Sequence, residues 1–275
     1  MRGRQLLLLV LLCQVVFVQD VFSHSSGDTT ANKIVGGEYI GIEEVPFQAF
    51  VLTDKNTCGG VIYNEEYIVT AAHCLQNIKR VQIRVGFNSW YDSEEKYPYM
   101  NGTYTVHEKY NNPGKNTNFD YDIALIKLLK KLKLDGVKIA KATFVERGKE
   151  LADGTNCTVS GWGSTTLCFQ EGGAPSAYLK SAFLEKVSYK ECSKDYEKYL
   201  TPRMVCAAPP SDRWAEFSNV CRGDSGGPLF DTATKKVAGL TSFLQDCEEY
   251  MPAVFTNLAD DGLRDWLKNH TQSEN

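Results

Sequence analysis

A glycine-rich segment around a single hydroxyl, Gly-Asp-Ser-Gly-Gly at residues 223–227, is the part of the sequence best suited to chemistry. Glycine lets the backbone adopt left-handed conformations and lets another chain approach closely. A serine on such a turn can present its oxygen outward beside backbone N–H groups. Acyl transfer needs this arrangement, because it requires both a nucleophile and donors for the oxyanion. The same composition also suits an ordinary hairpin turn.

A serine hydroxyl is a poor nucleophile until a base takes its proton, and two distant residues are candidates for that machinery. His73 lies in the segment Val-Thr-Ala-Ala-His-Cys, and Asp122 begins the segment Asp-Ile-Ala-Leu-Ile-Lys-Leu. Both residues stand beside apolar runs, as expected for side chains held near a core. Asp120 is the alternative to Asp122, but the apolar alternation that begins at Ile123 favours Asp122.

Four short motifs resemble the signatures of the trypsin/chymotrypsin-like serine proteases and occur in that family's order. They are Ile-Val-Gly-Gly at 34–37, Thr-Ala-Ala-His-Cys at 70–74, Asp-Ile-Ala-Leu at 122–125 and Gly-Asp-Ser-Gly-Gly-Pro at 223–228. The resemblance covers roughly residues 34–268. It implies an all-β, chymotrypsin-like fold of two six-stranded antiparallel β-barrels with a C-terminal α-helix. It also implies that Ser225 is the nucleophile, that His73 moves its proton, and that Asp122 orients the imidazole.

The resemblance further implies a route of activation. Cleavage after Lys33 would free the α-amino group of Ile34, which in this family pairs with the aspartate before the nucleophile, here Asp224. A buried carboxylate without a partner is costly, so this pair would lock the turn. The locked turn would aim the N–H groups of Gly223 and Ser225 at the oxyanion. We therefore expect a zymogen activated by a protease that cuts after lysine, with a plain loop at Lys33 as the alternative.

The residues that form the family's substrate pocket depart here from trypsin. Asn219 stands where trypsins carry an aspartate, so a basic substrate side chain would be buried without a counter-ion. Leu244 and Ala253 stand where glycines normally keep the walls open. We expect a shallow, partly apolar pocket that prefers small aliphatic residues before the cut. Arg222 at the rim either favours an acidic substrate residue or is simply solvated. The expected pocket residues are Asn219, Val220, Arg222, Ser242, Phe243, Leu244 and Ala253.

Nine cysteines indicate an oxidising compartment, and one of them, Cys13, lies in the N-terminal leader. The resemblance implies the disulfides Cys58–Cys74, Cys192–Cys206 and Cys221–Cys247. Relatives pair the residue at Cys157 with a cysteine six positions beyond the nucleophile, where this chain has Asp231. Counting then suggests Cys157–Cys168, although an intervening strand would carry the chain about 13 Å, beyond the roughly 7 Å that a disulfide spans. The alternative is a buried thiol at Cys157, with Cys168 free or intermolecular.

The N-terminus is typical of a secretory signal: a basic start at 1–4 and an apolar run at 6–18, too short for a membrane span. We expect a secreted, extracellular monomer. Its partners would be peptide or protein substrates, the activating protease and protein protease inhibitors, with no membrane partner. A formal net charge of −4 gives no indication of nucleic-acid binding. The expected regions are a signal peptide at 1–23, an activation peptide at 24–33 and a protease domain at 34–270, with barrel one at about 34–145, barrel two at about 146–257 and a helix at about 258–269.

Several local features complete the predictions. Strands are expected at 47–52, 61–70 and 81–85, a short helix at 188–197, and a long loop at 88–104. Asn101 in that loop is the expected glycosylation site. Trypsins bind calcium near this loop, but Phe87 stands where a glutamate would be needed, so no metal or cofactor is expected even though Glu94 and Glu95 follow. His107 is expected on the surface. A catalytically silent homologue that acts as a binding protein is the alternative function.

Overall fold

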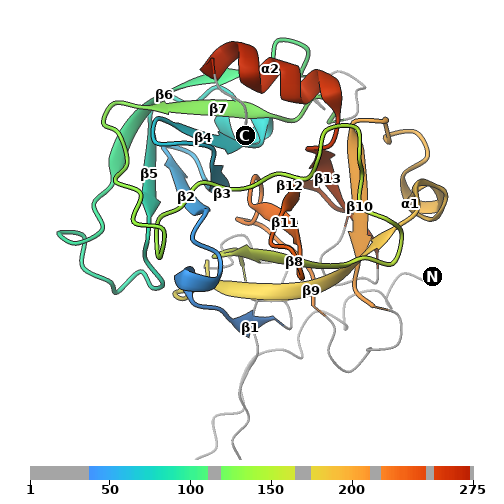
Figure 1. Ribbon diagram of the computed structural model, residues 1–275, viewed down its shortest axis with the longest axis horizontal. Coiled ribbons are helices and arrows are strands. Elements are labelled where there is room, and N and C mark those ends of the chain that lie inside the picture. The colour runs from blue at the N-terminus through green and yellow to red at the C-terminus, as the bar shows by residue number, and fades with distance from the viewer. Residues whose placement is uncertain (1–36, 111–118, 165–174, 211–217, 246–250, 273–275) are drawn as a thin grey trace, which may run out of the picture. The chain divides into compact units, whose positions relative to one another are not determined.

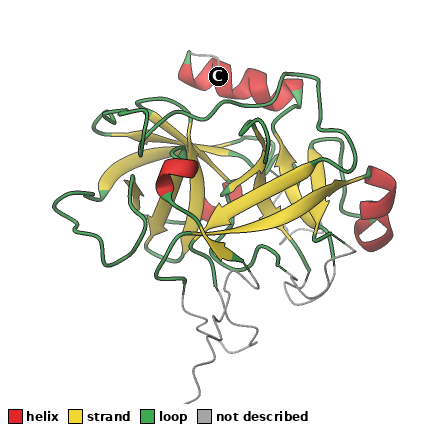
Figure 2. Cartoon of the chain, turned by 60° about the horizontal axis from the view of Figure 1, so that its bottom comes forward, coloured by secondary structure: helices red, strands yellow, loops and turns green. Residues whose placement is uncertain are grey.

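The computed structural model describes residues 37–110, 119–164, 175–210, 218–245 and 251–272. All of them belong to one compact unit, Asn32–Asn275. Within the described residues, strands dominate and the helices lie outside the sheets (Figure 2). No helix among these residues has the length and apolar character needed to cross a membrane.

The first half of the described chain closes into a six-stranded antiparallel barrel in the order β2-β3-β4-β7-β6-β5 (Figure 1). Alternate side chains point inward, and β-branched residues fill the interior. The apolar runs predicted as strands at 47–52 and 81–85 correspond to β2 and β5. The run predicted as one strand at 61–70 is instead the end of β3 and all of β4, separated by residues 63–66. The six strands are β2 (Gln48–Thr53), β3 (Thr57–Ile62), β4 (Tyr67–Thr70), β5 (Val81–Val85), β6 (Met100–Val106) and β7 (Ala124–Leu128).

The second half forms another antiparallel ring, β9-β10-β13-β12-β11-β8, which the pairing of β8 with β9 closes. A two-residue strand, β1 (Glu38–Tyr39), adds to the outside of β9. Its residues fall in the range expected for barrel one, yet they pair with the second sheet. The strands are β8 (Asn156–Gly161), β9 (Lys180–Val187), β10 (Met204–Ala208), β11 (Pro228–Asp231), β12 (Val237–Phe243) and β13 (Ala253–Asn257).

An aromatic and aliphatic core joins the two barrels. Phe50 of β2 packs edge-on against Trp162, with ring centroids 5.8 Å apart, and Phe47 packs edge-on against Phe230 of β11 at 5.4 Å. These four rings belong to a single buried cluster. A polar contact adds to it, because the Ser160 hydroxyl donates to Oε1 of the buried Gln48 at 2.7 Å. The barrels therefore dock through buried contacts, and residues at their junction are held from both sides.

Among the described residues, two short 3-10 helices, η1 (Ile42–Glu44) and η2 (Ala72–Leu75), and two α-helices accompany the barrels. Helix α1 (Tyr189–Tyr196) lies within the predicted range, and the Ser188 side chain caps its N-terminus. Helix α2 (Asp261–Thr271), at the top of Figure 1, begins after the capping residue Asp260. This helix overlaps the one predicted at about 258–269, and its apolar face is buried through Leu263, Trp266 and Leu267.

Two local predictions were wrong. Met100–Val106 forms β6 instead of continuing the loop, and most of its side chains are exposed, so it lacks the apolar alternation of a buried strand. Asn101 is thus an exposed strand residue paired with Gln82. His107 is buried, not on the surface, and its ring centroid lies 4.9 Å from that of Trp266 in a stacked arrangement.

The structure contains the predicted disulfides Cys58–Cys74 and Cys192–Cys206. Cys221 is also disulfide-bonded, whereas its expected partner Cys247 lies outside the described residues.

The suggested pair Cys157–Cys168 is wrong, because Cys157 is a free, fully buried thiol. Cys168 lies outside the described residues. Asp231 is the cross-strand partner of Cys157 in the pairing of β8 with β11. The carboxylate thus occupies the position where relatives place the second cysteine, and the alternative of a buried thiol is the correct one.

Candidate active site

His73 and Asp122 meet at the end of the first barrel. His73 lies in η2, directly after β4, and Asp122 lies two residues before β7, which pairs with β4. The backbone N–H of His73 donates to Asp122 Oδ1 at 2.9 Å, and the ring Nδ1 lies 2.8 Å from Oδ2. Because a carboxylate only accepts, this contact places the proton of the neutral ring on Nδ1. Nε2 is then the nitrogen that can accept a proton.

The second barrel holds the other side of Asp122. Ser242 of β12 donates its hydroxyl to Oδ2 at 2.5 Å, and the Thr256 hydroxyl of β13 donates to the Asp122 carbonyl at 2.7 Å. The carboxylate is almost fully buried. Asp120 serves elsewhere, since both of its oxygens bind the guanidinium of Arg203. The two barrels together therefore fix one carboxylate against the imidazole.

The electrostatics of the imidazole follow from this contact. Burial by itself lowers the pKa of His73, but the charge of Asp122 and its hydrogen bond outweigh burial, so the pKa is raised from its ordinary value. Such a ring is a stronger base than a free histidine. A general base near neutral pH is what activation of an alcohol requires.

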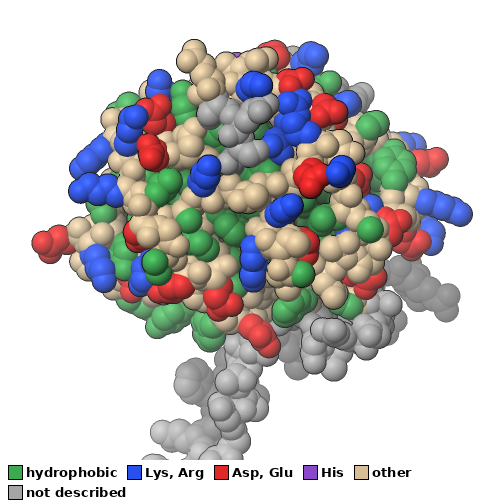
Figure 3. Space-filling view, viewed as in Figure 1, with side chains coloured by type: hydrophobic (Ala, Val, Ile, Leu, Met, Phe, Trp, Pro, Cys, Tyr) green, Lys and Arg blue, Asp and Glu red, His purple; other side chains and the backbone are tan. Residues whose placement is uncertain are grey.

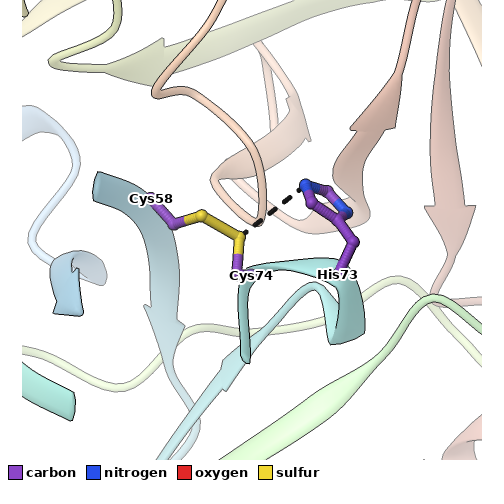
Figure 4. Close-up of side chains that lie close together, drawn as sticks. All are labelled: Cys58, His73 and Cys74. Atoms are coloured by element: carbon purple, nitrogen blue, oxygen red, sulfur yellow. Dashed lines mark hydrogen bonds between the residues drawn. A yellow bond between two sulfur atoms is a disulfide. The ribbon is translucent and has the colours of Figure 1, made fainter. Parts of the chain in front are cut away.

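A cysteine pair lies against the other edge of the ring (Figure 4). Cys74 Sγ is 3.8 Å from His73 Nε2. Cys58, His73 and Cys74 offer three ligand atoms close together, which resembles a metal-binding set. Both sulfurs are joined in a disulfide, however, and Nδ1 is taken by Asp122, so this set does not suit a metal ion.

Ser225 lies on a tight turn just before β11, at the junction of the barrels. The N–H of Gly59 in β3 donates to the Ser225 carbonyl at 2.8 Å, and the N–H of Gly226 donates to Thr241 in β12 at 2.7 Å. Cys74 Sγ lies 3.6 Å from the same Ser225 carbonyl. The turn and the histidine thus contact one disulfide. In the described part of the chain, the Ser225 hydroxyl makes no hydrogen bond to His73.

Glycine is required on this turn for steric reasons. Gly226 has φ +77, and a Cβ there would lie 2.7 Å from the Gly59 carbonyl oxygen and would overlap the Thr70 hydroxyl. Gly223 has φ +98. Within the described residues, neither the N–H of Gly223 nor that of Ser225 donates a hydrogen bond. Both donors are therefore available to an oxygen atom placed beside the serine.

The carboxylate of Asp224 points away from this turn into the protein. It accepts from the N–H of Gly163 at 2.9 Å and from that of Cys221 at 3.0 Å. Side chains at Gly161 and Gly163 would overlap it, which explains the two glycines that flank Trp162. Burial raises the pKa of Asp224 to about 6, and no cation bonds to it among the described residues. Lys33 and Ile34 lie outside those residues.

The residues expected to form the substrate pocket are mostly buried. Asn219 is fully buried and neutral: its amide nitrogen donates to the Met251 carbonyl at 3.2 Å, and its oxygen accepts from the N–H of Val220 at 2.9 Å. Leu244 packs against the apolar cluster that contains Val220 and Ala253. Arg222 is exposed. Leu244 thus lies beside Val220 and Ala253, and the side chain at Asn219 carries no charge.

Two aromatic residues near the site were not predicted. Phe119 meets the His73 ring edge-on at 5.9 Å and stacks on Phe243 at 4.9 Å, and Tyr196 of α1 packs edge-on against Phe243 at 5.6 Å. No motif marks either residue, because their proximity to the site arises only from the packing of distant segments.

Comparison with known proteins agrees with this geometry. The family model described as Trypsin matches residues 34–267. The chain is 32% identical to a vitellin-degrading protease of Bombyx mori over 240 residues, covering 86% of this chain and 84% of that protein. It is 31% identical to a chymotrypsin of Phaedon cochleariae, covering 87% and 83%. The solved structure of neuropsin, a serine protease expressed in the limbic system of mouse brain, matches with a TM-score of 0.73 and 27% identity, covering 85% of this chain and 98% of that one.

These relatives match over most of their length, and the range matched by the family model, 34–267, spans both barrels. The two-barrel fold predicted from the four motifs is confirmed, as is the family itself. The chain belongs to the trypsin family and is a serine endopeptidase with a chymotrypsin-like fold.

Proposed function

We propose that Ser225 attacks the carbonyl of a peptide bond while His73 takes its proton and returns it to the leaving amine. Asp122 orients the imidazole and stabilises it when it is charged. One observation carries this proposal: the Asp122 carboxylate binds both the ring and the backbone of His73, at 2.8 and 2.9 Å. Because both of its oxygens are bound, the Asp122 carboxylate cannot rotate away from the His73 ring. The free N–H groups of Gly223 and Ser225 would bind the oxyanion.

The environment of Asp224 supports a zymogen. A fully buried carboxylate with two N–H donors and no cation among the described residues is a site prepared for a positive charge. Cleavage after Lys33 would supply one, the α-ammonium group of Ile34. Pairing would fix the backbone on both sides of Asp224, and therefore the donors for the oxyanion. We assign residues 1–23 as a signal peptide, 24–33 as an activation peptide and 34–270 as the secreted protease domain.

The pocket supports a preference for small aliphatic residues before the cut. Asn219 uses both ends of its amide within the protein, so it offers no charge to a lysine or arginine side chain. Burying that side chain without a counter-ion is unfavourable. Leu244 and Ala253 further reduce the space available to a large side chain. A pocket of this kind also cannot accept Lys33, so activation requires a separate tryptic protease.

Labelling by a fluorophosphonate probe tests these assignments. After trypsin cuts the purified chain at Lys33, the probe should label Ser225, and the variants Ser225→Ala and His73→Ala should remain unlabelled. The uncut chain, incubated alone, should neither label nor generate a new terminus at Ile34. Absence of labelling after complete cutting would favour the alternative function, a silent homologue that binds a partner. Tissue or culture-medium localisation of the full chain tests secretion.

A panel of peptide substrates that differ only in the residue before the cut tests the pocket. We expect alanine and valine substrates to have the highest kcat/KM. Arginine or lysine substrates being fastest would refute the assignment of Asn219 and Leu244 as the determinants. Complexes with protein protease inhibitors should form only after activation, since these inhibitors occupy the same cleft as the substrate.

A further inference from the structure

An ion pair between the two barrels holds the segment that leads into Asp122. Asp120 is buried in the segment before β7 of the first barrel, two residues ahead of Asp122. Nε and Nη2 of Arg203, which directly precedes β10 of the second barrel, donate to its Oδ1 and Oδ2 at 2.8 and 2.6 Å. The Thr201 hydroxyl also donates to Oδ1, at 2.8 Å. Groups of the second barrel therefore bind both oxygens of the Asp120 carboxylate.

The setting of this pair differs from that of ion pairs on the surface. Acidic and basic side chains are interspersed on the face shown in Figure 3, where solvent screens them. Arg147, for example, pairs with Asp261 and Asp265 of α2, whose side chains are largely exposed, and such pairs contribute little to a fold. The side chains of Arg203 and Asp120 are only 25% and 13% exposed. Their two-point contact fixes the direction of the carboxylate as well as its position.

The residue between Asp120 and Asp122 has a backbone conformation that needs support. Tyr121 has φ +57, in the left-handed region that residues other than glycine rarely adopt. Its N–H donates to Asp120 Oδ1 at 3.0 Å, and its ring centroid lies 4.4 Å from the guanidinium carbon of Arg203. The His107 ring also contacts it, with centroids 4.7 Å apart. Strained residues persist where their neighbours over-determine them, so we expect the Asp120–Arg203 pair to maintain this turn.

The same two strands hold the other end of the segment. Strand β10, which follows Arg203, pairs with β13, which carries Thr256. The Arg203 carbonyl accepts from the N–H of the residue after Thr256 at 2.8 Å, and the Thr256 hydroxyl donates to the Asp122 carbonyl at 2.7 Å. One piece of the second barrel thus holds both Asp120 and Asp122. Because Asp122 Oδ2 lies 2.8 Å from His73 Nδ1, a displacement at Arg203 would reach the imidazole contact.

We propose that Arg203 is a positioning residue that acts through Asp120 to hold the Asp122 carboxylate in place beside the catalytic imidazole. This inference rests on the proposed function, because it deepens the role given there to Asp122. The guanidinium is suited to the task because its planar fork binds both carboxylate oxygens, whereas a lysine ammonium is a single point charge. A lysine should therefore replace Arg203 only in part, and an apolar side chain of similar length should not replace it.

The variants Arg203→Met and Arg203→Lys of the full chain, cut after Lys33, test this proposal with an alanine peptide substrate. Arg203→Met should lower kcat on the order of 10-fold, less than the roughly 100-fold of a 1 Å misplacement, because the other hydrogen bonds to Asp122 remain. KM should change by less than about 2-fold, since the substrate pocket is unaltered. Arg203→Lys should recover part of the lost kcat. Combining Arg203→Met with Asp120→Asn should lower kcat by less than the product of the single effects.

The His73 ring supplies a second readout that does not require turnover. The Nδ1 proton shared with Asp122 gives a downfield proton NMR signal, which is assigned by its loss in His73→Ala. Arg203→Met should move this signal upfield, and Arg203→Lys should move it less. If the cut wild-type chain does not hydrolyse peptides, the proposed function fails, and the Nδ1 signal alone then decides whether Arg203 positions Asp122.

Arg147→Met is the matched control, because Arg147 also contacts two carboxylates, those of Asp261 and Asp265, but far along the chain from Asp122. It should leave both kcat and the Nδ1 signal unchanged. Urea denaturation of each variant gives its folded fraction, to which kcat is referred. A wild-type Nδ1 signal in Arg203→Met would overturn the proposal, as would an unchanged kcat in its folded fraction. So would equal effects of Arg147→Met and Arg203→Met on kcat and the signal.

Discussion

Comparing Gly226→Ala with Gly136→Ala separates the backbone cost of a side chain at positive φ from the cost of a steric clash. Gly226 has φ +77, and an added Cβ would lie 2.7 Å from the Gly59 oxygen and 2.8 Å from the Ala71 nitrogen, besides overlapping the Thr70 hydroxyl. Gly136 has a similar φ of +72, yet nothing lies within 4 Å of its Cβ position. The Gly136→Ala variant therefore measures the backbone cost alone, and Gly226→Ala measures that cost plus the steric clash.

The expected magnitudes follow from the contacts. A non-glycine residue in the left-handed region costs roughly 1–2 kcal/mol, reduced by about 0.4–1 kcal/mol because alanine restricts the unfolded chain. Gly136→Ala should thus lower the free energy of unfolding by about 1 kcal/mol. At Gly226 the clash adds about 1–3 kcal/mol of overpacking. Displacement of Thr70, whose hydroxyl donates to the Gly59 carbonyl at 2.8 Å, adds about 1 kcal/mol more.

Activity should respond more strongly than stability. Any shift that relieves the clash also moves Ser225, the neighbour of Gly226, and a misplacement of about 1 Å lowers rates on the order of 100-fold. Urea denaturation gives the two stabilities, and the rate of fluorophosphonate labelling after cutting gives the activity. The reasoning is refuted if Gly226→Ala is as stable as Gly136→Ala and labels at the wild-type rate.

Three further predictions concern titratable groups. Burial lowers the pKa of His73, but Asp122 raises it by more, so its pKa lies above the ordinary histidine value of 6.5. The acid limb of the kcat/KM profile should therefore lie above pH 6.5, and Asp122→Asn should move that limb to lower pH. In the uncut chain, burial raises the pKa of Asp224 from 3.8 to about 6. This shift stabilises the folded state at low pH, and about 3 kcal/mol of that stability is lost as the pH rises from 3.8 through about 6. Asp224→Asn should therefore be more stable than wild type at pH 8 but not at pH 3.5; urea denaturation showing an equal difference at both pH values would contradict this. Burial raises the pKa of Cys157 to about 12, so iodoacetamide at pH 8 should label this thiol only after unfolding, and rapid native labelling would be inconsistent with its burial.

The sequence allowed prediction of those parts of the fold whose residue types are dictated locally. The strand Val81–Val85 alternates because one face fills the barrel, and Ser188 and Asp260 have the residue types that cap helices. Strand β6 could not be predicted in this way. Its side chains are mostly exposed, and Gly102 lies so close to Ile126 that no side chain fits. Strand β1 was not predicted, because two residues carry no pattern that selects a partner strand.

Cys157 shows where counting fails. An even number of cysteines suggested a pair, but pairing depends on which residues oppose one another across strands. The residue opposite Cys157 is Asp231, a fact of register between β8 and β11 that the sequence does not display. Close by, the hydroxyls of Thr158 and Thr232 are 2.8 Å apart and join the same two segments. A hydrogen bond thus links the strands where a disulfide would otherwise do so.

The candidate site depends on the docking of the two barrels more than its motifs suggest. His73 and Asp122 belong to the first barrel, yet the hydroxyls that hold Asp122 come from Ser242 and Thr256 in the second. The Ser225 turn belongs to the second barrel, yet the Gly59 N–H of the first barrel holds its carbonyl. Because the pKa of His73 is raised through Asp122, the second barrel supports the basic imidazole by holding that aspartate. Each barrel thus positions the reactive group of the other, and neither could form the site alone.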